Sequence, residues 1–91
     1  MQAVDINTAM HLVQTNAVNR AIVQCYDGRR WAILLRGRAE FVVRSDRQNP
    51  RSFGKVETAL GVIRDMGLRH AEIDFERWDP DQSTLTQGKI A

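Results

Sequence analysis

Two apolar runs on either side of a short basic turn constrain the fold of this chain more than any other feature. Residues 29–45 contain the runs 31–35 and 39–43, separated by Arg36-Gly37-Arg38. Runs rich in branched and aromatic residues that flank a glycine turn are typical of a β-hairpin. Because arginines lie at both ends of the segment, the hairpin is predicted to be both a core element and the most basic part of the protein.

The length of the turn decides which side chains share a face of this hairpin. A three-residue loop, 36–38, pairs Leu35 with Ala39 and gathers the apolar residues, whereas a two-residue loop, 37–38, would shift the register by one and mix the faces. We therefore prefer the three-residue loop. It predicts one face with Ile22, Tyr26, Trp31, Ile33, Leu35, Ala39, Phe41 and Val43, interrupted by Gln24. The opposite face then carries Val23, Cys25, Ala32, Leu34 and Val42 together with Arg30, Glu40 and Arg44.

The remaining elements follow from hydrophobic periodicity. Helical spacing of apolar residues predicts helices over 5–18 and 55–66, the first capped by Asp5 or Asn7 and the second stopped at Gly67. Alternation predicts strands over 21–26 and 70–76, and Phe53 is predicted to fill the core before the second helix. We expect a single α+β domain over residues 1–80, in the order α-β-β-β-α-β with an antiparallel sheet, followed by a disordered tail at 81–91.

The length and composition limit the class of protein. Ninety-one residues with 43% hydrophobic and 26% charged content correspond to one small globular domain. The chain has no long apolar run, its first residues do not resemble a signal peptide, and its single cysteine, Cys25, cannot form an internal disulfide. These features predict a cytoplasmic protein without a membrane span.

Charge is distributed unevenly along the chain. Residues 29–55 hold eight basic and two acidic side chains, whereas the rest of the chain holds five basic and nine acidic ones. Arginine forks bind phosphate and guanine edges, and a basic β-ribbon can enter a DNA major groove. The candidate nucleic-acid-binding residues are Arg36 and Arg38 at the hairpin tip, Arg47 and Arg51 in the loop that follows, and Arg30 and Arg44 on the sheet.

The acidic strand offers a competing interpretation of the same arginines. Within residues 70–76 the carboxylates Glu72, Asp74 and Glu76 alternate with apolar residues. If this strand lies beside residues 38–45, Arg30 and Arg44 could form cross-strand ion pairs with it and the basic face would be neutralised. Separation of the two strands would leave a basic surface.

No pattern in the chain indicates catalysis. His11 and His70 are the only histidines, and no histidine or cysteine pair has the spacing of metal ligands. Cys25 lies among apolar neighbours, which is typical of a buried structural thiol. A nucleophile elbow, a phosphate-binding loop and a dinucleotide fingerprint are all missing from the sequence. We therefore expect a protein that is not an enzyme and has no cofactor or metal.

Apolar residues on both faces of the predicted sheet suggest association. One amphipathic helix cannot cover two faces, so the second face needs either the N-terminal helix or another subunit. The second possibility predicts a homodimer, in which the same patch is used twice.

Residues 20–78 also resemble a known group of proteins. The segments 30–37, 41–45, 50–53 and 57–68 are similar to small partition-associated, ParC-like proteins of plasmids and integrated conjugative elements. The resemblance implies an accessory protein of a mobile element and brings no catalytic residue with it. At the level of fold alone, the β-β-β-α order also resembles the DNA-gripping arm-binding domains of tyrosine recombinases. The expected function is a non-enzymatic accessory protein that binds duplex DNA weakly; the alternative is a homodimeric protein–protein adaptor that does not bind nucleic acid.

Overall fold

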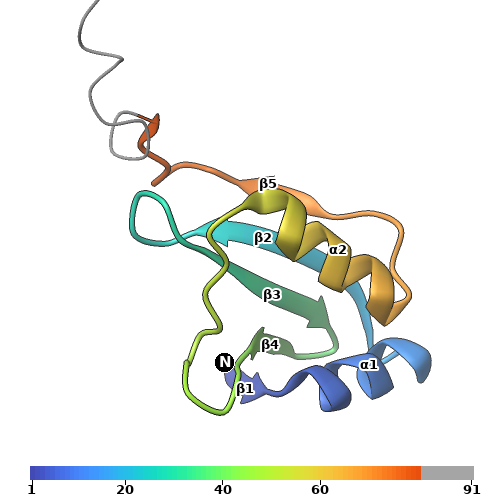
Figure 1. The fold of residues 1–91 in the computed structure, drawn as a ribbon. Coiled ribbons are helices and arrows are strands. Elements are labelled where there is room, and N and C mark those ends of the chain that lie inside the picture. Colours follow the sequence, from blue (N-terminus) through green and yellow to red (C-terminus); the bar gives the residue numbers. More distant parts are fainter. Residues whose placement is uncertain (81–91) are drawn as a thin grey trace, which may run out of the picture.

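Two helices and five strands form residues 1–80, the part of the chain that the computed structural model describes (Figure 1). In chain order they are β1 (Gln2–Val4), α1 (Ile6–Gln14), β2 (Val18–Cys25), β3 (Trp31–Gly37), β4 (Glu40–Val43), α2 (Val56–Met66) and β5 (Glu72–Asp74). The predicted α+β class is confirmed. The predicted order omitted only β1, since a three-residue strand is too short to show alternation. The predicted tail, 81–91, lies outside the described residues.

The five strands form one mixed sheet in the order β1-β4-β3-β2-β5. The expected antiparallel arrangement holds for β2, β3 and β4, whereas the edge strands β1 and β5 run parallel to β4 and β2. Helical crossovers join β1 to β2 and β4 to β5, and each leaves the two strands it joins parallel, as a tight hairpin cannot.

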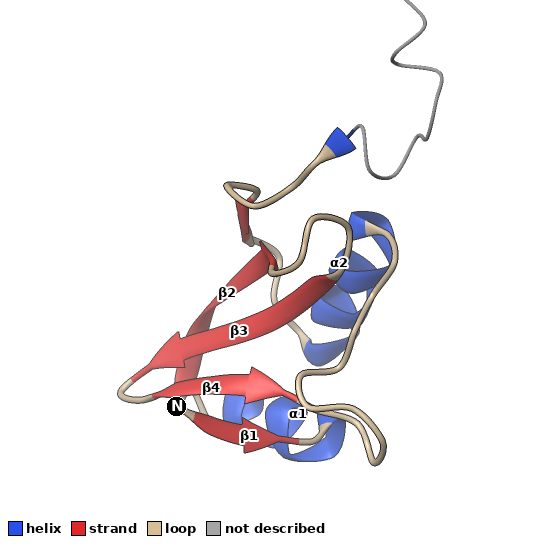
Figure 2. Cartoon of the chain, turned by 90° about the vertical axis from the view of Figure 1, so that its left-hand side faces the viewer, coloured by secondary structure: helices blue, strands red, loops and turns tan. Residues whose placement is uncertain are grey.

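Both helices lie on the same face of the sheet (Figures 1 and 2). The crossover from β1 through α1 to β2 and the crossover from β4 through α2 to β5 leave parallel strands and move the same way across the sheet. Since such crossovers are right-handed almost without exception, both helices are delivered to one side. The other face of the sheet is left without a helix among the described residues.

The hairpin formed by β3 and β4 has the predicted faces but a different register. Arg36 pairs with Glu40 and Leu35 with Phe41, so three residues, 37–39, connect the paired positions. The predicted pairing of Leu35 with Ala39 was wrong by two residues, and a shift of two leaves every side chain on its predicted face. The turn moves because Gly37 is still part of β3, where it pairs with Val18 of β2.

The register of β2 differs from the prediction, so that the opposite face of this strand packs against the helices. Val23 pairs with Ile33 and Cys25 with Trp31, so Ala21, Val23 and Cys25 face the helices instead of Ile22 and Tyr26. The connection has three residues, 27–29, and Tyr26 N–H donates to the Arg30 carbonyl. A pairing register that is shifted by one residue moves every side chain of the strand to the opposite face.

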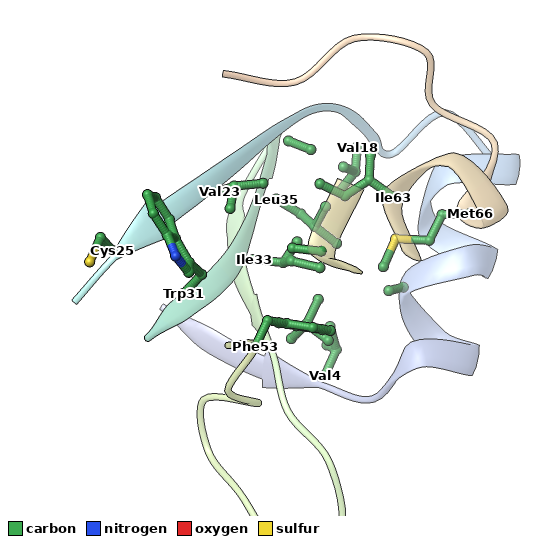
Figure 3. Close-up of a cluster of buried hydrophobic side chains, with 14 residues drawn as sticks. Val4, Val18, Val23, Cys25, Trp31, Ile33, Leu35, Phe53, Ile63 and Met66 are labelled. Carbon is green, nitrogen blue, oxygen red and sulfur yellow. The ribbon is translucent and has the colours of Figure 1, made fainter. Parts of the chain in front are cut away.

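The core lies between the sheet and the two helices (Figure 3). Val23, Ile33 and Leu35 of the central strands pack there against Ile63 and Met66 of α2. The structure confirms that Cys25 is buried and that Phe53 joins the core. Phe53 also exchanges two backbone hydrogen bonds of 2.9 Å with Trp31.

Local chemistry accounts for the ends of the helices. Asp5 caps α1, because its side chain accepts a 2.8 Å hydrogen bond from the Thr8 N–H. α1 is shorter than the predicted 5–18, since Asn16 has a φ of 64° that no helix continues through. α2 ends at the predicted Gly67, whose φ of 112° is left-handed. No helix in residues 1–80 combines the length and apolar character needed to cross a membrane.

β5 is shorter than the predicted strand 70–76 and less buried. Only Glu72–Asp74 form the strand, and both Ile73 and Phe75 are exposed although they alternate with carboxylates as predicted. The predicted apolar face therefore has little to pack on. β5 lies at the edge of the sheet, where α2 covers it only in part (Figure 1).

Candidate nucleic-acid interface

The structure divides the six predicted arginines into two groups. Arg36 and Arg38 lie at the tip of the hairpin formed by β3 and β4. Arg30 precedes β3, and the three remaining arginines follow β4, namely Arg44, Arg47 and Arg51. Because β3 and β4 are antiparallel, the start of one strand and the end of the other lie at the same end of the sheet. We call Arg36 and Arg38 the tip group and the other four the loop group.

Arg36 is partly neutralised within its own hairpin. Its Nε lies 2.8 Å from Glu40 Oε2, and the two residues are directly opposite each other across the strands. The Nε makes no hydrogen bond within the described residues, so the contact is an ion pair without good donor geometry. Arg38 at the turn is exposed, and its side chain has no ion pair or hydrogen bond within residues 1–80.

Arg30 is also paired locally. Its Nε lies 3.3 Å from Asp27 Oδ2, and its backbone N–H donates to Asp27 Oδ1 at 2.9 Å. One aspartate therefore both shapes the connection between β2 and β3 and neutralises part of the charge of Arg30. Both side chains remain about half exposed, so the pair is accessible to solvent and screened by it.

Arg47 and Arg51 project from a braced loop. Ser45 Oγ accepts a 3.0 Å hydrogen bond from the Gln48 N–H, and the Arg51 N–H donates to the Val43 carbonyl at 2.9 Å. These bonds fix the backbone of the loop close to the end of β4. Arg47 and Arg51 line an open hollow on its surface together with residues 45, 46 and 48.

The two side chains of that loop differ in what they contact. The Arg51 guanidinium lies 5.1 Å from the centroid of the Phe53 ring, a cation–π contact that holds it against the core aromatic. The Arg47 side chain is exposed and has no ion pair or hydrogen bond within residues 1–80. Arg47 is therefore the most accessible cation of the loop group.

Arg44 connects the loop group to the N-terminus. Its N–H donates to the Val4 carbonyl at 2.8 Å, directly beyond the pairing of β4 with β1. The pKa of Asp5 is lowered by hydrogen bonds from the Thr8 backbone and side chain and, to a smaller extent, by the charge of Arg44. The arginine thus lies close enough to the helix cap to affect its ionisation.

The acidic strand does not neutralise the arginines as the competing interpretation expects. β5 pairs with β2, and both β2 and β3 separate it from β4. Neither Arg30 nor Arg44 pairs with Glu72, Asp74 or Glu76. Instead Arg20 of β2 forms an ion pair with Glu72, and Gln24 donates a 3.1 Å hydrogen bond to Asp74, which lowers the pKa of that carboxyl.

Arg20 is the ion-pairing residue that sequence reasoning missed. It lies just before the predicted strand 21–26 and within the observed β2. Its partner lies 52 residues away, on a strand that the chain reaches through a crossover. No local pattern identifies which strand a crossover will pair with.

The other candidate side chains do not form a reactive group. His11 is exposed on α1, His70 is exposed before β5, and Cys25 is buried in the core. Within residues 1–80, no group of three or more histidine, cysteine, aspartate or glutamate side chains is placed to hold a metal ion.

Comparisons with known proteins do not assign the chain to a family. No protein-family model matches it, and neither curated proteins nor solved structures include a match.

Proposed function

We propose that the protein is a non-enzymatic accessory protein that binds duplex DNA through the loop group and the tip group of arginines. The observation that supports this proposal is the separation of charge across the sheet: two strands, β3 and β2, lie between β4 and β5, and the carboxylates of β5 contact β2. A role in a plasmid or an integrated element is supported by the resemblance of residues 20–78 alone.

The spacing of the two groups suits a nucleic-acid backbone. Four residues of β4 separate them, which corresponds to about 13 Å at the rise of a strand. The major groove of B-DNA is about 12 Å wide, so the two groups could reach phosphates on both sides of one groove. Among residues 1–80, Arg44, Arg47 and Arg51 of the loop group have no carboxylate in ion-pair contact, whereas Arg36 of the tip group is paired with Glu40. We therefore expect the loop group to contribute more to DNA binding than the tip group.

Salt-dependent binding to a fluorescently labelled duplex tests the proposal. Each phosphate contact that is lost should reduce the slope of log K against log salt by about 0.9. The variant Arg38→Ala/Arg47→Ala removes one exposed arginine from each group without breaking an ion pair or a side-chain hydrogen bond, and should lower the slope by about 2. We expect anisotropy titrations at several salt concentrations to show this change.

A charge-matched variant separates local contacts from overall charge. Arg64→Ala/Arg77→Ala removes two positive charges from α2 and from the turn after β5, outside both arginine groups. It should bind DNA almost as well as the unaltered protein. The proposal fails if no binding is detected at low salt, or if both double variants lose affinity equally.

A homodimeric adaptor that does not bind nucleic acid is the second candidate. The observation that favours it is the face of the sheet that carries no helix (Figure 2). We place it second because the apolar residues at the centre of that face expose little surface: Ile22 is 5% exposed and Leu34 is 8% exposed. Sedimentation velocity over a range of concentrations decides this candidate, since a monomer throughout excludes it.

A further inference from the structure

Large exposed apolar side chains are concentrated at the β5 edge of the sheet. In the described part of the chain, Ile73, Phe75 and Trp78 are 45%, 61% and 44% exposed. Single exposed apolar residues are normal on a monomer, but three large ones within six residues are a patch that indicates a partner.

The backbone around this patch is available for pairing and is held in place. β5 pairs with β2 on one side, and no other strand of residues 1–80 pairs with its outer side. The turn that follows is closed by a 3.0 Å hydrogen bond from the Trp78 N–H to the Phe75 carbonyl, and the Asp79 N–H donates to the Gly28 carbonyl. An ordered edge strand is a template for an added strand.

The charges along this edge determine which strand would fit. Within β5, Glu72 and Asp74 alternate with Ile73, so their carboxylates and the Ile73 side chain project to opposite faces. Phe75 follows the strand, and Glu76 lies in the turn after it. Glu72 and Asp74 already contact β2, whereas the Glu76 side chain is exposed and has no contact of this kind within residues 1–80. The edge therefore presents an excess of negative charge next to exposed apolar surface.

These charges disfavour a second copy of the chain as the occupant. Antiparallel pairing of two β5 strands about a twofold axis would place the carboxylates of Glu72 and Asp74 opposite one another. Like charges that lie directly opposite across strands are destabilising.

We propose that the outer edge of β5 binds an extended segment of a partner protein in which basic and apolar side chains alternate. Main-chain hydrogen bonds to β5 would add the segment as a sixth strand. Its lysines or arginines would lie beside Glu72 and Asp74, and its apolar side chains would pack against Ile73 and Phe75. Of the six arginines, Arg36 alone lines an open hollow together with Glu72, Asp74 and Glu76. The site contains none of the other five and does not depend on DNA binding.

Tryptophan fluorescence of the full chain tests this proposal with defined peptides. The probe is a blocked peptide of alternating lysine and valine. Trp78 is exposed at the site, and Trp31, which is 5% exposed, provides a constant background. We expect a saturable shift of the emission to shorter wavelength, and binding at least about tenfold tighter than that of an alternating glutamate–valine peptide.

Three controls separate strand addition from attraction by charge alone. A peptide of the same composition with all lysines in one block should bind at least about tenfold more weakly, because it cannot segregate its two faces. Phe75→Ala should weaken binding of the alternating peptide by a similar factor. Leu60→Ala, which removes an exposed apolar side chain from α2, should leave binding unchanged.

Several results would overturn the proposal. Equal binding of the alternating and block peptides would indicate simple electrostatic attraction. Concentration-dependent dimerisation that Phe75→Ala abolishes would make a second copy the occupant. Absence of peptide binding, with Trp78 emission already shifted to shorter wavelength in the protein alone, would show that the chain itself covers this edge.

Discussion

At the scale of single residues, two glycines in regular elements have opposite roles. A Cβ at Gly37 would overlap the Ala17 carbonyl and lie 2.8 Å from the Val18 Cα, because β3 passes very close to the start of β2. A Cβ at Gly61, in the middle of α2, would meet nothing within 4 Å. The first glycine is required by close packing of the backbone, and the second only weakens its helix.

These environments predict opposite effects of one substitution. Gly37→Ala should lower the free energy of unfolding by about 1–3 kcal/mol, since the strands must move apart. Gly61→Ala should raise it by about 0.5–1 kcal/mol, because alanine is the better helix former. Urea denaturation followed by circular dichroism measures both. Equal changes in the two variants would contradict the close approach at Gly37.

The cap of α1 predicts a dependence of stability on pH. Hydrogen bonds from Thr8 lower the pKa of Asp5 below its ordinary value of 3.8, so folding favours the ionised carboxylate. The extra stability relative to Asp5→Ala is therefore complete above about pH 3.8. It should decrease as the pH falls from there through the lowered pKa of the folded state.

Denaturant midpoints measured between neutral and acidic pH test this effect. Asp5→Asn is the control, because asparagine also caps helices but does not titrate. The difference between the unaltered protein and Asp5→Asn should likewise diminish in acid. A difference that stays constant down to the acid limit would show that the charge of Asp5 does not stabilise the helix.

At the scale of elements, the long connection between β4 and α2 is anchored by one aromatic residue. Phe53 is buried in the core, and its backbone bonds to Trp31 hold the connection beside β3. The same side chain supports the Arg51 guanidinium. This anchor links the stability of the core to the position of the loop group.

Two phenylalanine variants separate the anchor from an ordinary surface aromatic. Phe53→Ala should cost about 3–5 kcal/mol of unfolding free energy through the cavity it leaves. Phe75→Ala should change stability by no more than about 0.5 kcal/mol, since Phe75 is exposed. Thermal denaturation of the two variants provides the measurement. Similar losses in both would contradict the assignment of Phe53 to the core.

At the scale of the whole molecule, the sheet separates a basic half from an acidic edge. Three strand spacings lie between β4 and β5, which is about 14 Å. The Debye length at physiological salt is about 8 Å, so the arginines that follow β4 should interact little with the β5 edge through solvent. Arg36 is the exception, because it lines a hollow together with Glu72 and Asp74.

We expect the exposed arginines Arg38 and Arg47 to act independently of the β5 edge, because neither lines that hollow. Arg38→Ala/Arg47→Ala should reduce DNA binding and leave binding of the alternating lysine–valine peptide unchanged. Phe75→Ala should have the reverse effect. Titrations of each variant with each ligand check this prediction, and a variant that impairs both would indicate that the two ligands share a surface.

Elements whose chemistry is local were predictable from the sequence. The cap at Asp5, the stop at Gly67, the burial of Phe53 and the hairpin of β3 and β4 depend on neighbours in the chain or on periodicity. The six arginines could likewise be picked out from composition. Their division into two groups followed only once the hairpin and the braced loop had definite geometry.

The sequence alone determined where the two helices and the strands β2 to β5 lie along the chain, and which face of the hairpin of β3 and β4 is apolar. Only the tertiary structure decided the reversed face of β2, the place of β5 beside β2 and the location of both helices on one side. The physical reason is that hydrophobic periodicity indicates which side chains are buried but not which other elements of the protein cover them. One residue more or less in a loop exchanges the two faces of the strand that follows or precedes it. The neighbour of a strand that follows a crossover is decided by packing across the whole sheet.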